Sequence, residues 1–231
     1  MIDGQEKGKK GRGVFVTATG TDVGKTFVTA LMVKKLKEAG FASGYYKAAL
    51  SGADSISESD AGYVKRTAGI SQDSETLLSY LYKNAVSPHL AAKLEGNPVN
   101  LETVRRDYEA VLKAHDYVTV EGSGGIVCPI RWDGKRKILL EDVIKELALP
   151  AVIVADAGLG TINAVVLTAE YLKSRGIEVK GVILNHYAGG VMQEDNVKMI
   201  EEISKVPVVA RVKEGALELE IEAEKLMELY R

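Results

Sequence analysis

One short stretch decides the fold of this chain: Gly20-Thr21-Asp22-Val23-Gly24-Lys25-Thr26. An apolar run at residues 14–17 precedes it, and apolar residues at helical spacing follow from Phe27 to Leu36. This order predicts a strand, a glycine-rich turn and a helix. The backbone N–H groups of such a turn surround an anion, and the helix N-terminus adds partial positive charge. The stretch therefore predicts a loop that binds the phosphates of a nucleotide.

The last two residues of the stretch carry the side chains that such a loop needs. Lys25 can reach the β- and γ-phosphates, and the hydroxyl of Thr26 can bind Mg²⁺. The loop is a variant, because Thr19 stands where its first glycine is expected, after Ala18, and Gly20 supplies the flexibility. A turn that merely connects a strand to a helix is the alternative. Gly-Lys-Thr between these two elements makes it the weaker interpretation.

The composition narrows the class of partners. The chain has 231 residues, with 30 Lys and Arg against 32 Asp and Glu, and a formal net charge of −2. A charge this small attracts neither nucleic acid nor an anionic membrane non-specifically, so we expect neither as a partner. No apolar run approaches the length that spans a membrane.

The single cysteine, Cys128, excludes an intramolecular disulfide and fits a reducing compartment, which predicts a cytoplasmic protein. No histidine is near it in sequence, so a packed thiol is favoured over a catalytic one. The three histidines are too scattered to predict a zinc site. Residues 1–12 are rich in Gly and Lys without an apolar core, and we expect a disordered leader there. Residues 13–231 contain no linker or repeat and are expected to form one domain.

Strand and helix patterns alternate along the rest of the chain. Apolar, β-branched runs without strict alternation predict strands covered on both faces, at residues 13–17, 42–47, 77–82, 117–121, 151–155, 181–185 and 206–212. Helical spacing predicts helices at residues 25–38, 59–68, 101–115, 140–146, 161–175, 193–204 and 217–230. The sequence therefore predicts an α/β fold, a single-domain P-loop NTPase-like fold with a mostly parallel, doubly wound sheet of about seven strands.

Ligands of such sheets bind beyond the carboxyl ends of the strands. Polar residues and glycines gather at these ends, in segments 19–22, 47–51, 121–125, 156–163 and 185–186. Lys47 taken alone is more often a solvated loop lysine. Beside a phosphate loop it becomes a candidate for stabilising transition-state charge, with Ser51 as a nearby hydrogen-bond donor.

A carboxylate ends the apolar run at residues 117–121. Glu121 resembles the acidic Mg²⁺ partner of phosphate-loop enzymes, and with Thr26 it offers two oxygen ligands. Asp60 could supply a third, or could be a charge in the first turn of the helix that begins near Ser59, and the residues alone leave these alternatives even. The glycines after Glu121 allow a backbone to approach a ligand closely.

Two further segments lie at the same edge of the predicted sheet. The helix that starts near Thr161 could receive an anion such as a carboxylate at its N-terminus, or Thr161 or Asn163 could simply cap it. Asn185 ends an apolar strand and could recognise a base edge or merely make a turn.

Taken together, these motifs resemble the dethiobiotin synthetases of the biotin pathway. The resemblance runs from about Gly13 to the end of the chain, and its pieces stand in matching order and spacing. The pieces are Val16-Thr17-Ala18-Thr19-Gly20-Thr21-Asp22-Val23-Gly24-Lys25-Thr26, Tyr46-Lys47 with Ser51-Gly52, Ser59-Asp60-Ala61, Ser87-Pro88-His89, Val120-Glu121-Gly122-Ser123-Gly124-Gly125, and Leu159-Gly160-Thr161-Ile162-Asn163 with Leu167-Thr168-Ala169.

The resemblance implies a role for each matching residue. The catalytic residues it implies are Lys47, Lys25 and Thr21. The residues on the substrate side are Ser51, Thr161, Ile162 and Asn163, the last three contributed by the partner subunit of a homodimer. The nucleotide-binding residues are Asp22, Val23, Gly24, Lys25, Thr26, Phe27, Asp60, Glu121, Gly122, Ser123, Gly124, Asn185, His186, Lys213, Glu214 and Gly215. The Mg²⁺ ligands are Thr26, Asp60 and Glu121.

The activity that the resemblance implies is an ATP- and Mg²⁺-dependent ring closure by a ligase. The substrates are 7,8-diaminopelargonate and CO₂ or bicarbonate, and the product is dethiobiotin with its ureido ring. One amine takes up CO₂ as a carbamate, which attacks the γ-phosphate to give a carbamic-phosphoric anhydride, and the second amine then closes the ring. No protein nucleophile is required, so catalysis consists of positioning and charge stabilisation.

Two other phosphate-loop classes fit the residues less well. Amidoligases acting on substrates such as cobyrinate usually carry a further glutaminase domain, for which 231 residues leave no room. Partitioning ATPases, which are nucleotide switches, usually carry a second lysine near the start of the loop, where this chain has Ala18, Thr19 and Gly20. Lys47 and Ser51 also favour the ligase.

Overall fold

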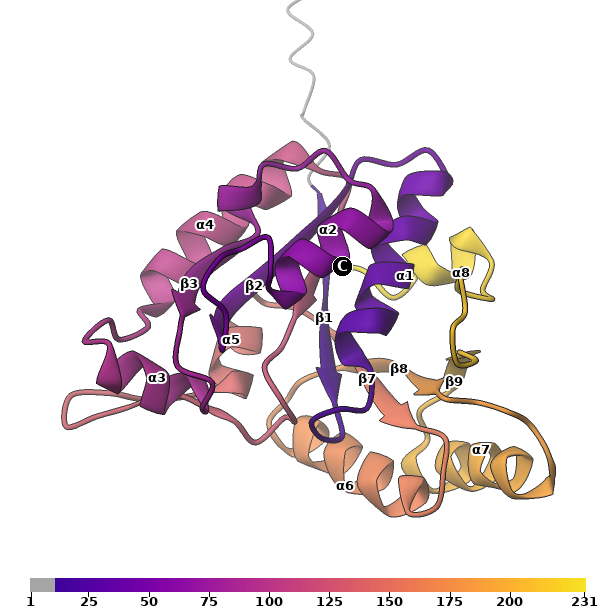
Figure 1. Cartoon of the computed structure of the whole chain (residues 1–231). Helices are drawn as coiled ribbons and strands as arrows, with labels where there is room; N and C mark the ends of the chain where they lie inside the picture. The colour runs from indigo at the N-terminus through magenta and orange to yellow at the C-terminus, as the bar shows by residue number, and fades with distance from the viewer. Residues whose placement is uncertain (1–10) are drawn as a thin grey trace, which may run out of the picture.

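The computed structural model describes residues 11–231. Within them, seven parallel strands form a central sheet in the order β3-β2-β4-β1-β7-β8-β9 (Figure 1). The strands are β1 (Arg12–Ala18), β2 (Ser43–Ser51), β3 (Leu78–Tyr82), β4 (Tyr117–Glu121), β7 (Ala151–Asp156), β8 (Val179–Asn185) and β9 (Val208–Arg211). Because β1 lies in the middle, the loop after it opens where the strand order reverses, the usual place for a ligand.

Helices cover both faces of the central sheet. On one face lie α1 (Lys25–Glu38), α2 (Asp60–Ala68) and α8 (Ala223–Met227). On the other face lie α4 (Leu101–Ala114), α5 (Leu140–Glu146), α6 (Thr161–Ser174) and α7 (Val191–Ser204). A shorter helix, α3 (Pro88–Leu94), packs against a hairpin of β5 (Pro129–Trp132) and β6 (Lys137–Leu139).

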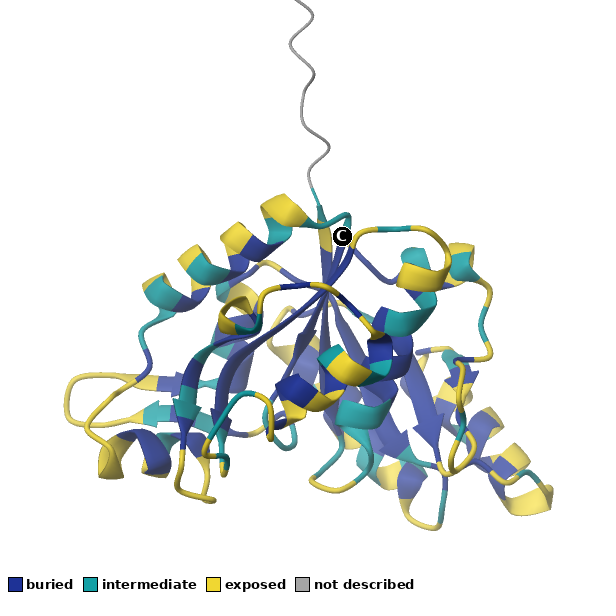
Figure 2. Ribbon diagram, turned by 45° about the horizontal axis from the view of Figure 1, so that its top comes forward, coloured by how far each residue is buried: buried dark blue, intermediate teal, exposed yellow. Residues whose placement is uncertain are grey.

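The central strands are buried on both faces, which explains why their sequences do not alternate. Figure 2 shows these strands in the colour of buried residues, whereas the helices turn exposed residues outward. Every residue of β1 from Val14 to Ala18 is 0% exposed. Phe15 packs into the cluster beneath α4 to α7, and Val14 and Val16 pack into the cluster beneath α1 and α8. Burial on both sides is typical of a parallel sheet with helical crossovers.

Within residues 11–231, the predicted α/β fold with a doubly wound sheet of seven strands is confirmed, and each predicted strand overlaps an observed one. α1 spans the predicted residues 25–38. The helix predicted over residues 217–230 is wrong over most of its length, because α8 covers Ala223–Met227. Before it, residues 214–222 form turns, bends and irregular chain, in which Leu217 is 79% exposed and Leu219 is 1% exposed.

The sequence pattern does not predict α3 or the β5–β6 hairpin. α3 has seven residues, and β6 has three. Segments this short contain too few apolar positions to establish a period, so their conformation depends on what they pack against.

The predicted leader, residues 1–12, lies outside the described residues except for Gly11 and Arg12, and Arg12 begins β1. The C-terminal residue lies beside this strand, since Arg231 and Gly13 exchange backbone hydrogen bonds of 2.8 and 3.0 Å. In the described part of the chain, no helix combines the length and the apolar character needed to cross a bilayer.

We expect Leu172→Ala to lower the free energy of unfolding by about 2–5 kcal/mol, because this α6 side chain is 0% exposed and its loss leaves a cavity. Leu217→Ala removes the same atoms from a side chain that is 79% exposed, and should change that free energy by less than about 0.5 kcal/mol. Urea unfolding of the two variants, compared at equal m-values, measures the difference. Equal losses in both variants would contradict this assignment of the core.

Candidate functional site

The pairing of β2 with β4 places a lysine against a carboxylate. In this parallel pair Lys47 lies opposite Glu121, and Tyr45 lies opposite Thr119. Residues two apart on a strand point to the same face of the sheet. Tyr45 and Lys47 therefore share a face with Glu121, the face that α1 and α2 cover.

The first residues of α1 and α2 complete a group of charges around Glu121. Lys25 Nζ lies 2.5 Å from Glu121 Oε1, and Thr26 Oγ1 donates to the same oxygen at 2.7 Å. Lys47 Nζ lies 2.7 Å from Asp60 Oδ2 and 3.1 Å from Glu121 Oε1. We call these five residues the charge cluster. It unites two lysines, two carboxylates and a hydroxyl from β2, β4, α1 and α2.

Burial and charge act in opposite directions in the charge cluster. Burial alone raises the pKa of Glu121, but attraction to Lys25 and Lys47 outweighs it and lowers the pKa to about 2. Burial lowers the pKa of Lys47, but the two carboxylates beside it outweigh this and raise the pKa. For Lys25 burial prevails over attraction to Glu121, and the pKa falls below its usual value. Lys25 pairs with one carboxylate of the charge cluster, whereas Lys47 pairs with two.

The donor set of the charge cluster fits a magnesium ion bound together with a triphosphate. Thr26, Asp60 and Glu121 offer hydroxyl and carboxylate oxygens, the hard ligands that Mg²⁺ prefers. Within residues 11–231, no group of three or more His, Cys, Asp or Glu side chains lies close enough to hold a metal. A magnesium ion here would take its remaining ligands from phosphate oxygens and water, as is usual beside a phosphate loop.

The phosphate loop depends on two left-handed residues. Asp22 has a φ of 61° and Gly24 a φ of 83°. A Cβ on Gly24 would lie 2.0 Å from Asn185 Nδ2, so only glycine fits there. Ala18, in contrast, is the last residue of β1, and neither it nor Thr19, which stands in place of the first glycine of the motif, has a positive φ. The missing first glycine of the motif therefore does not strain this loop.

Asn185, at the end of β8, braces the phosphate loop. Its Nδ2 donates to the carbonyl of Val23 at 3.1 Å and lies 3.2 Å from His186 Nε2. His186 Nδ1 lies 2.7 Å from Asp156 Oδ2, so in neutral His186 Nδ1 donates and Nε2 accepts the amide proton. Asn185 is 1% exposed. The sequence suggested two roles for Asn185, base recognition and turn formation, and the hydrogen bond to Val23 adds a third, that of bracing the phosphate loop.

A cavity of about 930 Å³ opens beside the charge cluster. Its lining comprises residues 20–22, 24–26, Lys47, 50–52, Asp60, 85–88, 123–125 and 127–129. Hydrogen bonds join its walls, from Ser51 Oγ to the carbonyl of Val86 at 2.6 Å and from Ser123 Oγ to the carbonyl of Ala49 at 2.8 Å. The size suits a small-molecule ligand.

The structure brings many of the predicted site residues to this cavity. Those that line it are Thr21, Asp22, Gly24, Lys25, Thr26, Lys47, Ser51, Asp60, Ser123 and Gly124. Glu121 lies behind the lining and holds Lys25. Among the described residues, the predicted site residues outside the lining are Val23, Phe27, Gly122, Thr161, Ile162, Asn163, Asn185, His186, Lys213, Glu214 and Gly215.

The start of α6 and the segment after β9 lie apart from the cavity. The N-cap of α6 is Gly160, without a side-chain capping bond, so the alternative in which Thr161 or Asn163 caps this helix is wrong. Asp60 begins α2 and also contacts Lys47 in the charge cluster. Its position therefore fits both alternatives for this residue, a charge in the first turn of a helix and a ligand of Mg²⁺. The segment 213–215 lines a second cavity of about 380 Å³.

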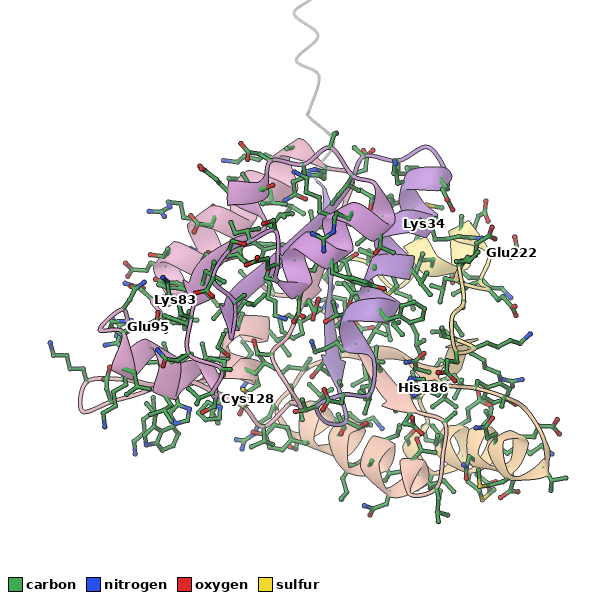
Figure 3. All side chains as sticks on the ribbon, viewed as in Figure 1. Lys34, Lys83, Glu95, Cys128, His186 and Glu222 are labelled. Carbon is green, nitrogen blue, oxygen red and sulfur yellow. The ribbon has the colours of Figure 1, made fainter. Side chains whose placement is uncertain are left out.

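Tyr45 also contacts the charge cluster, although the sequence did not predict it as a site residue. Tyr45 Oη donates to Glu121 Oε2 at 3.0 Å. Its position could have indicated the contact, because Tyr45 comes two residues before Lys47 and so lies on the same face of the strand. Cys128, labelled in Figure 3, lines the cavity and is a packed thiol as predicted. Burial raises the pKa of this thiol to about 11, which argues against a nucleophilic role.

Several solved structures share this fold. A plasmid partition protein from Borrelia burgdorferi superposes with a TM-score of 0.59 at 10% identity, covering 96% of this chain and 98% of that one. A ParA family ATPase from Chlorobium tepidum gives a TM-score of 0.54 at 14% identity, covering 96% and 92%. At these identities the similarity shows the fold alone, that of the P-loop NTPases.

Sequence comparisons are more specific. A family model described as an AAA domain matches residues 12–217. The ATP-dependent dethiobiotin synthetase BioD of Brachyspira hyodysenteriae is 52% identical over 210 residues, which cover 90% of this chain and 95% of that protein. The BioD of Clostridium botulinum is 49% identical over 224 residues, covering 95% and 98%. With its fold and charge cluster, this similarity shows that the chain belongs to the ATP-dependent dethiobiotin synthetases, a family of ligases.

Proposed function

We propose that the protein closes the ureido ring of dethiobiotin from 7,8-diaminopelargonate, CO₂ and ATP with Mg²⁺. The observation that carries the proposal is the charge cluster at one wall of the 930 Å³ cavity. A phosphate loop ends at this wall, and the remaining volume extends toward Ser51 and the segments 85–88 and 127–129. Family membership supports the same activity. We further propose that the reaction takes place in the cytoplasm.

The residues of the charge cluster suit a phosphoryl transfer that needs no protein nucleophile. The free N–H groups at the start of α1 and the ammonium of Lys25 bind the β- and γ-phosphates. Thr26, Glu121 and Asp60 would hold the magnesium ion, which neutralises phosphate charge when bound. Lys25 then exchanges Glu121 for phosphate, and because Glu121 is its one carboxylate partner in the charge cluster, a single ion pair has to be replaced.

Lys47 stabilises the reacting charge. In the proposed reaction one substrate amine takes up CO₂ as a carbamate, and a carbamate oxygen attacks the γ-phosphorus, releasing ADP. The second amine then displaces phosphate from the mixed anhydride and closes the ring. Lys47 is buried and held between two carboxylates, so its ammonium is fixed in place before negative charge develops.

We propose a homodimer in which α6 of one subunit completes the site of the other. At the start of α6 the N–H of Thr161 donates to the carbonyl of Gly158 at 3.3 Å, and the next two N–H groups, those of Ile162 and Asn163, are left for a carboxylate. Within the described chain these groups do not line their own subunit's cavity. Beside them, Leu159 is 95% exposed and Leu167 is 62% exposed, apolar surface that a second copy would cover.

The test of the function is ring closure itself. The protein is incubated with diaminopelargonate, labelled bicarbonate, ATP and Mg²⁺, and dethiobiotin and ADP are quantified. We expect label in the ureido carbon and one ADP per ring. ADP formation that does not depend on the diamine would count against the proposal and favour a nucleotide switch.

Lys47→Gln should lower kcat at least about a hundredfold, because the variant keeps the shape of the side chain but removes the cation that stabilises the attack on the γ-phosphate. Lys83→Gln makes the same change at a lysine whose side chain is 75% exposed and serves as the control. Steady-state kinetics and a thermal unfolding curve are recorded for both. A folded Lys47→Gln protein with near-normal kcat would remove Lys47 from the mechanism.

Nucleotide discrimination should be modest, on the order of tenfold in kcat/KM among ATP, GTP and CTP, equivalent to about 1.4 kcal/mol. The triphosphate has the loop N–H groups, Lys25 and Mg²⁺ as binding partners. The Nδ2 of Asn185 is already engaged by Val23 and His186, which leaves the acceptor Oδ1 of this amide to read a base. Kinetics with the three nucleotides check this. An ATP preference of a thousandfold would show that residues near 213–215 make specific contacts with adenine.

Two inactive variants should complement each other if the site is shared between subunits. Lys47→Gln removes one half of the site, and Asn163→Trp, at an exposed position, blocks the start of α6. Statistical mixing after unfolding and refolding leaves one intact site in half of the dimers, so about a quarter of the wild-type activity should return. Mixed dimers that form without regaining activity would contradict the shared site.

A further inference from the structure

We propose that Tyr45 is a positioning residue that fixes the orientation of the Glu121 carboxylate, so that Glu121 can serve the nucleotide-bound magnesium ion after Lys25 has moved away. The inference rests on the proposed function, since it concerns the same site. It assigns a role to a residue outside the cavity lining that the motifs of the phosphate loop do not include.

The four hydrogen bonds of Glu121 are divided unequally between its two oxygens. Lys25, Thr26 and Lys47 all donate to Oε1, at 2.5, 2.7 and 3.1 Å. Within residues 11–231, the donor to Oε2 is Tyr45 Oη, at 3.0 Å. The hydroxyl of Tyr45 therefore decides which carboxylate oxygen faces the phosphate loop.

The sheet itself sets this contact. Tyr45 lies opposite Thr119, and Glu121 follows Thr119 by two residues on the same face, so Tyr45 and Glu121 are diagonal neighbours across β2 and β4. A diagonal pair is too far apart for short side chains but lies within reach of an aromatic one. Tyr45 thus spans the gap between the two strands.

Tyr45 is also held firmly. It is 0% exposed and packs among apolar residues of α1 and α2, including Ala30, Val33 and Ala61. In so dense an interior the ring stays in one position, so its hydroxyl is a fixed donor. Lys25, in contrast, has a flexible stem and a side chain that is 10% exposed at the cavity.

The fixed position of Tyr45 and the flexibility of Lys25 have different consequences when a nucleotide binds. Lys25 is drawn to the phosphates, and Oε1 of Glu121 loses its closest cation. Without a donor on Oε2, the carboxylate could then rotate toward Lys47, the remaining cation beside it. The Tyr45 hydrogen bond prevents this rotation and keeps Oε1 beside the hydroxyl of Thr26, so that these two oxygens would be placed to hold the magnesium ion.

The chain contains a matched control next to the residue itself. Tyr46 points to the opposite face, where its hydroxyl donates to the carbonyl of Val104 at 3.0 Å and lies 2.6 Å from Ser79 Oγ. Tyr45→Phe and Tyr46→Phe therefore delete the same atom from adjacent buried rings. The first change touches Glu121, and the second touches α4.

The experiment measures ADP binding by calorimetry, in EDTA and in saturating Mg²⁺, for the wild type and both variants. Tyr45→Phe should bind ADP in EDTA within about twofold of the wild type, because the phosphate loop is intact. The increase in affinity that Mg²⁺ produces should shrink at least fivefold, and the Mg²⁺ concentration for half-maximal ring closure should rise correspondingly. Tyr46→Phe should keep the wild-type magnesium effect even if it lowers the melting temperature.

A double-mutant cycle shows whether Tyr45 acts through Glu121. In a Glu121→Gln background, Tyr45→Phe should cause no further loss of the magnesium effect. Additive losses, or a Tyr45→Phe protein with the wild-type magnesium effect, would overturn the inference while leaving the proposed function standing. A wild type that binds no ADP would instead overturn the proposed function.

A crystal structure of the wild type with Mg²⁺ and ADP is a second measurement that does not depend on the stability of any variant. Lys25 should have left Glu121, and Tyr45 Oη should remain within about 3.2 Å of Oε2. A hydroxyl that has lost Glu121 in this state would contradict the positioning role.

Discussion

The buried carboxylate of Glu121 is the constraint on which the rest of the site depends. A carboxylate that is 1% exposed persists as an anion only if cations and hydrogen-bond donors replace the water it has lost. Two elements supply them: β2 provides Lys47 and Tyr45, and α1 provides Lys25 and Thr26. A third element, α2, provides Asp60 as the second partner of Lys47. Moving any of these elements would leave a buried charge without its partner. The charge cluster and the packing of these elements therefore depend on each other.

The phosphate loop likewise depends on a contact from a distant part of the chain. Its left-handed turn at Gly24 is possible because no side chain intrudes, and the space above that glycine is taken by the amide of Asn185. Asn185 comes from β8, far along the chain, and its own orientation depends on His186 and Asp156. A loop that must offer N–H groups to an anion is thus braced by a neutral amide, which adds no charge to compete with the nucleotide.

Without a nucleotide, the charge cluster is close to neutral, with two lysines against two carboxylates. This arrangement keeps the cations near where phosphate charge would arrive. In the proposed reaction only the exchange of Lys25 from Glu121 to phosphate would be needed at that moment, while Lys47 and Tyr45 would stay in place. Preorganised charge of this kind is what a reaction without a protein nucleophile requires.

The sequence by itself determined the strands, most of the helices and the residues at the carboxyl edge of the sheet. These rest on local signals: the apolar period of each segment, and Gly-Lys-Thr between a strand and a helix. The tertiary structure alone decided that Tyr45 reaches Glu121, that Asn185 braces Val23, and that residues 217–221 form bends and irregular chain rather than a helix. Each of these depends on the register between strands distant in sequence, or on packing against another element. No local period records such relations, because they exist only once the sheet has brought the segments together.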